Sequence, residues 1–385
     1  MNAAASLVVG VASASEAAQR AAEEALADLG GEPELAVAFA NAEYWPAAEE
    51  LVGELAKVLD GAPIVGCVAE GVVGTGREAE GGKAVSLWLA KGFQSPVETF
   101  AVEYLGTASG GLFAGHRFEP GGGAYLFFAD PFTFPVVELL DHLNSNVPGA
   151  FLAGGLASGG VQRQASKLFL DGSVVRAGAV GAHLAGAEVD LVVSQGCRPA
   201  GNPYTVTRAE RNVVHEMGGR PAYERLEQLV AGFPDEEKGL LADGGLQFGI
   251  AMDEYREALG QDDFLVRAVL GADPARGSVL VAGEVDVGKT VQFLVRDPGA
   301  ASRSLADCLE RESEALSGRA PAGVLLFPCN GRGSRLFSEP DHDAAMVKKV
   351  FGSVPVAGFF AAGELGPYAG KNFLHAFSAS MAIVR

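Results

Sequence analysis

The chain contains few cysteines, and their spacing is uninformative for metal binding. Its four cysteines, Cys67, Cys197, Cys308 and Cys329, lie far apart and form no CxxC pair. This spacing excludes the usual zinc motifs, and a disulfide framework is not expected in a chain of 385 residues. The sequence therefore predicts no metal site and no cofactor.

Long hydrophobic runs are also absent. No apolar run approaches the roughly 20 residues that a membrane-spanning helix needs. No Lys or Arg precedes Arg20, which argues against a secretory signal peptide. We therefore expect a cytoplasmic protein with reduced thiols that is not inserted into a membrane.

Positive charge is scarce. The chain has 29 Lys and Arg residues against 48 Asp and Glu residues, which gives a formal net charge of −19. Such a field repels phosphate groups, so neither nucleic acid nor an anionic membrane surface is an expected partner. The length and the hydrophobic content of 48% predict a large core divided between two domains.

A unit of strand, helix and strand occurs three times along the chain. In each copy an apolar strand ends at a polar residue, a proline begins the helix, and a second proline precedes a strand with a Gly-rich exit. The polar residues are Asn41, Asp130 and Asn330, and the helix-starting prolines are Pro46, Pro135 and Pro340. The polar residue lies five positions before the proline in the first two copies and ten in the third, which alone carries the insertion GRGSR.

The glycines of the copies also correspond. After the second proline the first and third copies align without gaps, as Gly66 with Gly358, Gly71 with Gly363 and Gly74 with Gly366. The second copy needs a one-residue gap to place Gly154 and Gly155. These repeated units predict an α/β protein of mixed sheets covered by helices, preferably a four-layer αββα sandwich. The alternative is an open doubly wound sheet.

The composition changes near Pro221. Residues 221–263 are helix-rich and acidic, and strand-like segments return after them. We therefore divide the chain into regions 1–225 and 226–385.

The insertion of the third copy holds the main candidate site. Polar groups after a buried strand lie where open α/β sheets bind ligands, which favours Asn330, Arg332 and Arg335 as ligands for an anionic group. Arg332 lies between two glycines and can bind a carboxylate through two parallel hydrogen bonds. Its alternative role is to pair with one of the acids of the protein itself.

Further candidates lie in other loops. Glu364, which follows Gly363, and Glu70 are both near Gly-rich strand exits and are expected to bind an amine. Arg198 and Tyr204 lie in a second polar loop that is a candidate wall of the same cavity.

Three motifs carry competing interpretations. Residues 283–290 match a phosphate-binding loop, but strand-like residues follow where that motif requires a helix, so a hairpin turn is favoured. The acids around His342 are better explained as caps of a helix start than as metal ligands. Cys329 lies near two arginines that would favour its thiolate, yet no His–Asn partnership supports a papain-like nucleophile, and packing is the alternative role.

Several ordered motifs resemble those of the FIST family. They are GCVAEGVVG, AGGLASGG, VVSQGCRP, CNGRGSRLF and PVAGFFAAGELGP, followed by NFLHAFSAS, and they extend over roughly residues 30–385. The resemblance implies an amino-terminal FIST region, a carboxy-terminal FIST_C region and a sensory module for small ligands such as amino acids. It supplies no established catalytic residues.

Three functions remain open. The first is a sensor of amino acids or related small carboxylates that passes its signal to a separate signalling protein. The second is an enzyme that uses Cys329 as a nucleophile or the polar loops for hydrolysis of a small metabolite, and we expect it less than a non-enzyme. The third is a scaffold for protein interactions.

Overall fold

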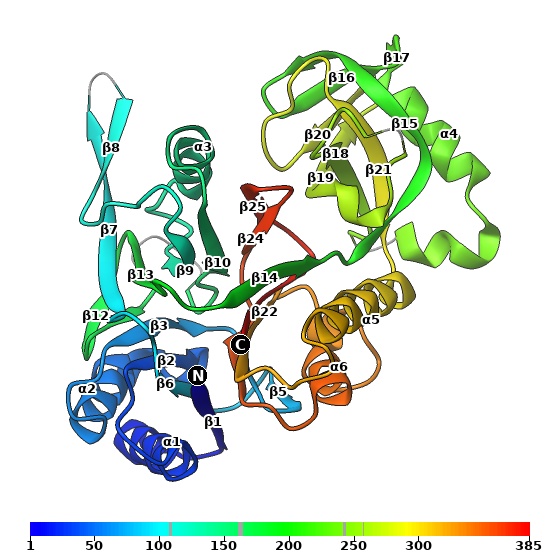
Figure 1. Ribbon diagram of the computed structural model, residues 1–385. Coiled ribbons are helices and arrows are strands. Elements are labelled where there is room, and N and C mark those ends of the chain that lie inside the picture. The colour runs from blue at the N-terminus through cyan, green and yellow to red at the C-terminus, as the bar shows by residue number, and fades with distance from the viewer. Residues whose placement is uncertain (108–109, 161–164, 242–243, 257) are drawn as a thin grey trace. The chain divides into compact units, whose positions relative to one another are not determined.

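The computed structural model describes residues 1–385 except 108–109, 161–164, 242–243 and 257. The chain forms two compact units (Figure 1). The first unit comprises Met1–Val193, Ala306–Leu374 and Ala379–Arg385, and the second comprises Ser194–Leu305 and His375–Ser378. These units do not follow the division near residue 225, because the first unit takes segments from both sequence regions.

The three repeated units each form a parallel strand–helix–strand element in the first unit. Both strands are apolar and almost entirely buried, as expected for strands in the middle of a covered sheet. The first copy is β2 (Leu35–Asn41), α2 (Ala48–Val58) and β3 (Ile64–Ala69). The second is β9 (Gly123–Ala129), α3 (Val136–Asn146) and β10 (Ala150–Leu156). The third is β22 (Gly323–Pro328), α6 (His342–Phe351) and β23 (Val356–Phe359).

Each parallel pair lies in the middle of its own mixed sheet. The first sheet has the order β1-β6-β2-β3-β11-β12, with β1 (Asn2–Val9), β6 (Ala84–Lys91), β11 (Leu168–Leu170) and β12 (Ser173–Val175). The second has the order β25-β24-β10-β9-β13-β7-β8, with β7 (Glu98–Thr107), β8 (Gly110–Ala114), β13 (Ala179–His183), β24 (Glu364–Tyr368) and β25 (Lys371–His375). The third has the order β14-β26-β22-β23-β4-β5, with β4 (Val72–Gly74), β5 (Arg77–Ala79), β14 (Val189–Ser194) and β26 (Ala379–Val384). Mixed α/β architecture is thus confirmed, and these three mixed sheets belong to the first unit.

The hairpin after each parallel pair joins the sheet of another copy. Hairpin β4–β5 leaves the first copy and pairs with β23 of the third. Hairpin β24–β25 leaves the third copy and pairs with β10 of the second, while β11–β12 leaves the second and pairs with β3 of the first. The three sheets are therefore connected by a cyclic exchange of hairpins.

The strand register shows which residues are equivalent. Gly66 lies opposite Ala38, Gly154 opposite Phe127 and Gly358 opposite Leu326. A Cβ on any of these glycines would lie within 2.2 Å of the facing carbonyl oxygen, so no other residue fits. Gly154 is therefore the direct counterpart of Gly66 and Gly358. By the same register the counterpart of Asn41 and Asp130 is Cys329, and not Asn330 as the sequence suggested.

The three sheets share one core. The residues that follow Ala38, Phe127 and Leu326 are Phe39, Phe128 and Phe327, and their rings form a triangle with centroid separations of 5.3, 6.1 and 5.8 Å. Aromatic pairs favour such edge-on distances. Apolar residues of all three sheets surround this triangle in one cluster.

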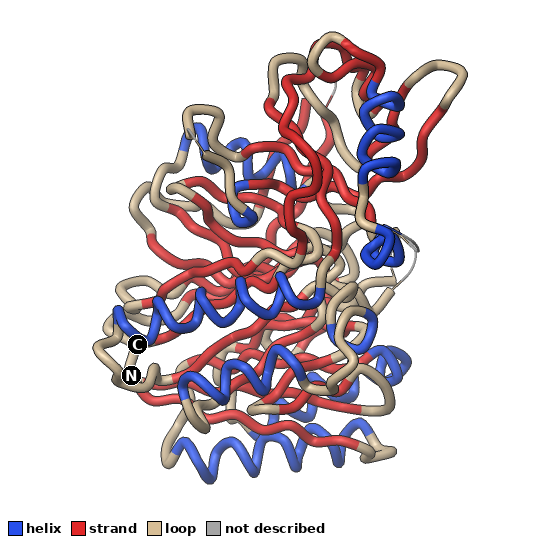
Figure 2. Tube along the Cα trace, turned by 90° about the vertical axis from the view of Figure 1, so that its right-hand side faces the viewer, coloured by secondary structure: helices blue, strands red, loops and turns tan. Residues whose placement is uncertain are grey.

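Helices cover the outer faces of the sheets. Helix α1 (Ala14–Leu29) begins after Ser13, whose side chain accepts a hydrogen bond from the Glu16 amide, and ends at Gly30 in the left-handed conformation. Figure 1 shows α1 and α2 side by side against the first sheet, where most of their alanines and leucines are buried. Figure 2, turned by 90°, shows helices lying along the strands. Helix α3 contributes Leu139, Leu140 and Leu143 to the outer face of the second sheet.

The main segment of the second unit begins at Ser194, the last residue of β14, and ends at Leu305 within helix α5 (Pro298–Ala315). It contains an antiparallel sheet of seven strands and helix α4 (Ala222–Gly232). In sheet order the strands are β15 (Cys197–Glu210), β21 (Thr290–Arg296), β18 (Leu246–Ala251), β19 (Phe264–Asp273), β20 (Ser278–Val281), β16 (Val213–Met217) and β17 (Arg220–Pro221). Residues 283–290 lead through a turn into strand β21 rather than into a helix, which confirms that they are not a phosphate-binding loop.

Candidate functional site

The loop after β22 leaves the carboxyl edge of the third sheet. Cys329 still forms a bridge with Ala361, and the Asn330 amide donates to the Ala361 carbonyl at 2.8 Å. The chain then turns through a short 3-10 helix, Gly333–Arg335. Gly333 has a φ of 57°, and a Cβ there would lie 2.6 Å from the Glu80 carboxylate, so the second glycine of GRGSR allows close approach of that acid.

A small polar cavity lies beside this loop. It measures about 120 Å³, and its walls come from the exit of β3, the end of β5, the loop after β22 and the residue after β23. The lining residues are Glu70, Gly71, Glu80, Asn330, Ser334, Arg335 and Phe360. The structure therefore brings together three of the residues predicted from sequence, Glu70, Asn330 and Arg335.

Glu70 and Arg335 form the charged pair of the cavity. Arg335 Nη1 donates to Glu70 Oε2 at 3.1 Å and to the Asn330 carbonyl at 2.8 Å, and Nη2 donates to Glu70 Oε1. Asn330 Nδ2 donates to Glu70 Oε2 at 3.3 Å. The hydrogen bond to Glu70 raises the Arg335 pKa, so the guanidinium is always charged. The Arg335 side chain is 54% exposed and the Glu70 side chain 38%, so a solute can reach both.

Glu80 and Ser334 complete the cavity and were missed by the sequence analysis. Glu80 accepts hydrogen bonds from the Ser334 amide at 2.8 and 3.0 Å and from its hydroxyl at 2.8 Å. This carboxylate satisfies a donor at the start of the 3-10 turn. The contact joins residues 254 positions apart, and no local pattern around Glu80 signals it.

Arg332 lies behind the cavity and is fully buried. Its Nε donates to Asp343 Oδ2 at 2.6 Å and its Nη2 to Asp343 Oδ1 at 2.8 Å, while its guanidinium lies 5.2 Å from the Phe337 ring centroid. The two-pronged donor that we assigned to a ligand carboxylate is thus occupied by an acid of the chain itself. Only Nη1 lacks a hydrogen-bond partner among the residues that the structure describes. Burial opposes the charge on Arg332, but Asp343 outweighs it and raises the Arg332 pKa.

The start of α6 is capped differently from our expectation. Glu78 Oε1 accepts hydrogen bonds from the amides of Asp343 and Ala344, at 2.9 and 3.0 Å. Asp341 makes no side-chain cap, and its Oδ1 instead accepts from the Glu78 amide at 2.7 Å. The cap therefore comes from hairpin β4–β5 of the first copy and fixes that hairpin to the third.

This capping carboxylate has an unusual acidity. Burial, followed by the nearby charge of Asp343, raises the Glu78 pKa to about 8. Burial also acts against ionisation of Asp343, but Arg332 lowers the Asp343 pKa to about 2. His342 Nδ1 lies 2.8 Å from Asp343 Oδ1 and its ring stacks on Phe337 at 3.5 Å, which further anchors the helix start.

Gly363 and Glu364 do not line the cavity. The Gly363 carbonyl accepts from the Leu156 amide at 2.9 Å, and Glu364 lies opposite Gly155, at the point where β24 joins the second sheet. Glu364 is buried, and its charge lies close enough to Arg332 to contribute to the raised Arg332 pKa. Both residues thus lie where one copy exchanges its hairpin with another.

Arg198 and Tyr204 belong to the second unit, where they lie in strand β15 rather than in the predicted loop and have partners. Arg198 donates from Nε to Asp297 Oδ2 at 2.6 Å and from Nη2 to Glu237. Tyr204 lies under the Arg225 guanidinium, 4.3 Å from its ring centroid. Their role as walls of the cavity beside Arg335 remains a prediction.

Cys329 is buried next to the cavity. Its Sγ accepts a hydrogen bond from the Gly331 amide at 3.5 Å, and its charge when ionised would lie near both Arg332 and Arg335. These contacts suit either of the two roles weighed for this thiol.

Side chains near the ends of β2 and β9 in the other two copies also form polar contacts. In the first copy Lys167 Nζ lies 4.4 Å from the Trp45 ring and binds Glu49 at 2.7 Å. In the second copy Asp130 accepts from the Ser166 hydroxyl at 2.6 Å and from Thr133.

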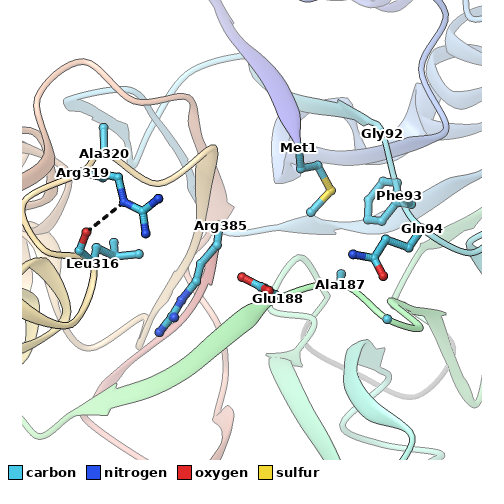
Figure 3. A pocket seen from close by; sticks show the side chains of 11 residues that line it. Met1, Gly92, Phe93, Gln94, Ala187, Glu188, Leu316, Arg319, Ala320 and Arg385 are labelled. Carbon is cyan, nitrogen blue, oxygen red and sulfur yellow. Dashed lines mark hydrogen bonds between the residues drawn. The ribbon is translucent and has the colours of Figure 1, made fainter.

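A larger cavity, of about 330 Å³, contains none of the residues predicted from sequence. Figure 3 shows Arg319 and Arg385 on one side of it and Phe93 and Gln94 on the other. Arg319 Nε donates to the Leu316 carbonyl at 3.4 Å, and Arg385 Nε is bound to Asp190 at 2.5 Å.

Comparison with known proteins identifies the family. The FIST N domain model matches residues 34–220, and the FIST C domain model matches residues 222–367. The chain belongs to the FIST family. FIST domains are generally described as small-ligand-binding sensory domains of signalling proteins.

Two relatives illustrate how far the similarity extends. An uncharacterized protein of Mycobacterium tuberculosis strain H37Rv is 46% identical over 372 residues, which cover 96% of this chain and 95% of that protein. An uncharacterized protein of Mycobacterium bovis is 44% identical over the same lengths. Among the described residues, no helix is long and apolar enough to cross a membrane.

Proposed function

We propose that this FIST protein is a sensory module whose ligand occupies the cavity between Glu70, Glu80 and Arg335. The proposed ligand is an α-amino acid or a related small carboxylate. One observation carries the proposal: a guanidinium and two carboxylates face one small cavity and match the two charges of a zwitterion. Asn330 and Ser334 add neutral polar groups beside them.

The ligand would replace an ion pair that the protein now forms within the cavity. Its carboxylate would replace Glu70 on Arg335, and its ammonium group would lie between Glu70 and Glu80. The existing Glu70–Arg335 pair is half exposed, and such pairs contribute about 1 kcal/mol or less, so their replacement costs little. The cavity volume of about 120 Å³ corresponds to roughly four waters and favours a ligand with a short side chain.

Glu70 also offers a route for the signal. Its amide donates to the Ser158 hydroxyl at 2.9 Å, and that hydroxyl donates to the Phe360 carbonyl at 2.5 Å. Glu70, Ser158 and Phe360 come from the strand exits of three different copies. A ligand that displaces the Glu70 side chain would therefore act on the junction of all three sheets. The separate signalling partner and the cytoplasmic location remain predictions.

A thermal-shift titration tests the site. Glycine, alanine, glutamate, acetate and methylamine are each added to the wild type, to Arg335→Ala and to Arg176→Ala. Arg176 is a matched control because it is a half-exposed arginine paired with Glu49 outside the cavity. A ligand at a hundredfold excess over its Kd adds about 2.7 kcal/mol to the free energy of unfolding.

We expect an amino acid to raise the Tm of the wild type and of Arg176→Ala but not of Arg335→Ala. Acetate and methylamine, which carry one charge each, should act more weakly. A Tm increase that persists in Arg335→Ala would show that the ligand binds at another site. No shift of the wild type by any compound would instead favour the scaffold function.

A further inference from the structure

The first unit contains a third cavity, of about 450 Å³, lined by both apolar and polar groups. It lies along β14 and is bounded by the start of the β9–β10 pair, the turn between β24 and β25, and helix α5. Its apolar walls include Ala124, Phe151, Val189, Leu191, Val192 and Pro367. It shares no lining residue with the cavity around Arg335.

The exchanged hairpin β24–β25 contributes one wall of this cavity. Strands β24 and β25 have five residues each, whereas β4, β5, β11 and β12 have three. The longer hairpin places its turn, Ala369 and Gly370, on one wall of the cavity. At the equivalent turn of the second copy, the Asp171 carboxylate is bound by the Thr99 hydroxyl of β7 at 2.9 and 3.1 Å. That contact brings the turn against the neighbouring strand.

Two carboxylates line this cavity, and their bonding differs. Asp190 Oδ2 accepts from Arg385 Nε at 2.5 Å and is thereby neutralised. Glu312, on α5, is partly buried, and its carboxylate forms no hydrogen bond or ion pair with any residue that the structure describes. Burial raises the Glu312 pKa and Asp190 adds to the effect, while Arg385 and Arg311 act in the opposite direction. A partly desolvated carboxylate without a counter-ion is stabilised by an added cation.

We propose that this cavity binds an organic cation with an apolar body, namely a primary amine or guanidinium on a short hydrocarbon group, with Glu312 as its counter-ion. The hydrocarbon group would lie against the apolar walls, and the charged group would reach Glu312 at the α5 side. Concave sites that combine apolar side chains with a few polar groups are typical of small-molecule binding. The proposal does not depend on the amino acid site.

Isothermal titration calorimetry with three matched probes tests the proposal. The probes are hexylamine, hexan-1-ol and hexanoate, which share a chain length and differ in the charge of the head group. Each is titrated into the wild type, Glu312→Gln and Glu310→Gln. Glu310 is an exposed glutamate on the same helix and controls for the general loss of one negative charge.

We expect hexylamine to bind the wild type and Glu310→Gln equally, and Glu312→Gln at least tenfold more weakly. Hexan-1-ol should bind all three proteins weakly, and hexanoate should not bind. Equal hexylamine affinity for the wild type and Glu312→Gln would overturn the proposal. So would hexan-1-ol binding the wild type as tightly as hexylamine does, or the absence of hexylamine binding to the wild type. Both substitutions lie on the solvent side of α5 or at the edge of the cavity. Urea unfolding of each variant checks that it is folded.

Discussion

Arg332 donates two parallel hydrogen bonds to Asp343, at 2.6 and 2.8 Å, in a part of the third copy where both side chains are buried. The pair joins the loop after β22 to the first turn of α6. It therefore fixes the loop that carries Asn330 and Arg335, while leaving those two residues at the cavity. Arg332 is accordingly a positioning residue in the proposed site.

The substitution Arg332→Ala should destabilise the protein strongly. It leaves a buried carboxylate without its partner, and breaking such pairs costs about 3–5 kcal/mol. In urea unfolding, Arg335→Ala is the matched comparison, because its half-exposed pair with Glu70 should cost about 1 kcal/mol or less. The double variant Arg332→Met with Asp343→Leu should recover much of the loss. Equal costs for the two single variants would show that the buried pair is not structural.

Three equivalent glycines should be irreplaceable. In Gly66→Ala, Gly154→Ala and Gly358→Ala the new methyl group would lie 1.7, 2.2 and 1.7 Å from a facing backbone carbonyl oxygen. The parallel strands would have to separate, so we expect each variant to be insoluble or to lose several kcal/mol, as for other severe overpacking. Gly53→Ala is the control, since nothing lies within 4 Å of its added methyl group in α2. That variant should gain roughly 0.5–1 kcal/mol in helix stability. Tolerance of alanine at the three strand positions would contradict the shared register.

The repeat could be predicted from sequence because its signals are local. Prolines at helix starts and glycines at strand exits mark each copy over about 35 residues, and the structure confirms all three. The exchange of hairpins could not be predicted. Gly74 pairs with Ala357, far along the chain, and no local pattern specifies which sheet a three-residue strand joins.

The candidate site was predicted in part for the same reason. Asn330 and Arg335 follow a recognisable strand, and Glu70 follows another, so loop position alone selected them. The partner of Arg332 could not be chosen from sequence among 48 acids. Glu80 was missed because its only signal is its contact with Ser334 across two copies.

Thiol labelling should distinguish a sensor from a cysteine-dependent enzyme. All four cysteines are buried, and reaction with a disulfide reagent requires exposure of the thiolate. We expect all four thiols of the native protein to react slowly, at rates set by local opening, and rapidly only in denaturant. A single fast thiol that disappears in Cys329→Ser would instead support the enzyme, and would require a search for its base.

Glu78 should make the protein less stable as the pH rises. The pKa of Glu78 is about 8 in the folded protein, against an ordinary value of 4.5. Between these two pH values the folded protein therefore holds a proton on Glu78 that the unfolded chain has lost. The stabilising contribution is therefore complete below about pH 4.5 and lost as the pH rises through about 8. One group can change the free energy of unfolding by at most about 1.4 kcal/mol per pH unit.

The variant Glu78→Gln isolates this contribution, because its amide oxygen can still accept from the Asp343 and Ala344 amides. Urea unfolding at pH 5, 7 and 9 should show the wild type losing stability relative to Glu78→Gln as the pH rises. Asp343 has the opposite pH dependence. Its pKa in the folded protein is about 2, below the ordinary value of 3.8, so its stabilising contribution is complete above about pH 3.8 and is lost as the pH falls through about 2. Glu314→Gln, an exposed substitution on α5, is the control and should follow the wild type. A constant difference between the wild type and Glu78→Gln from pH 5 to 9 would mean that Glu78 is ionised throughout, and that the helix cap binds as an ordinary carboxylate.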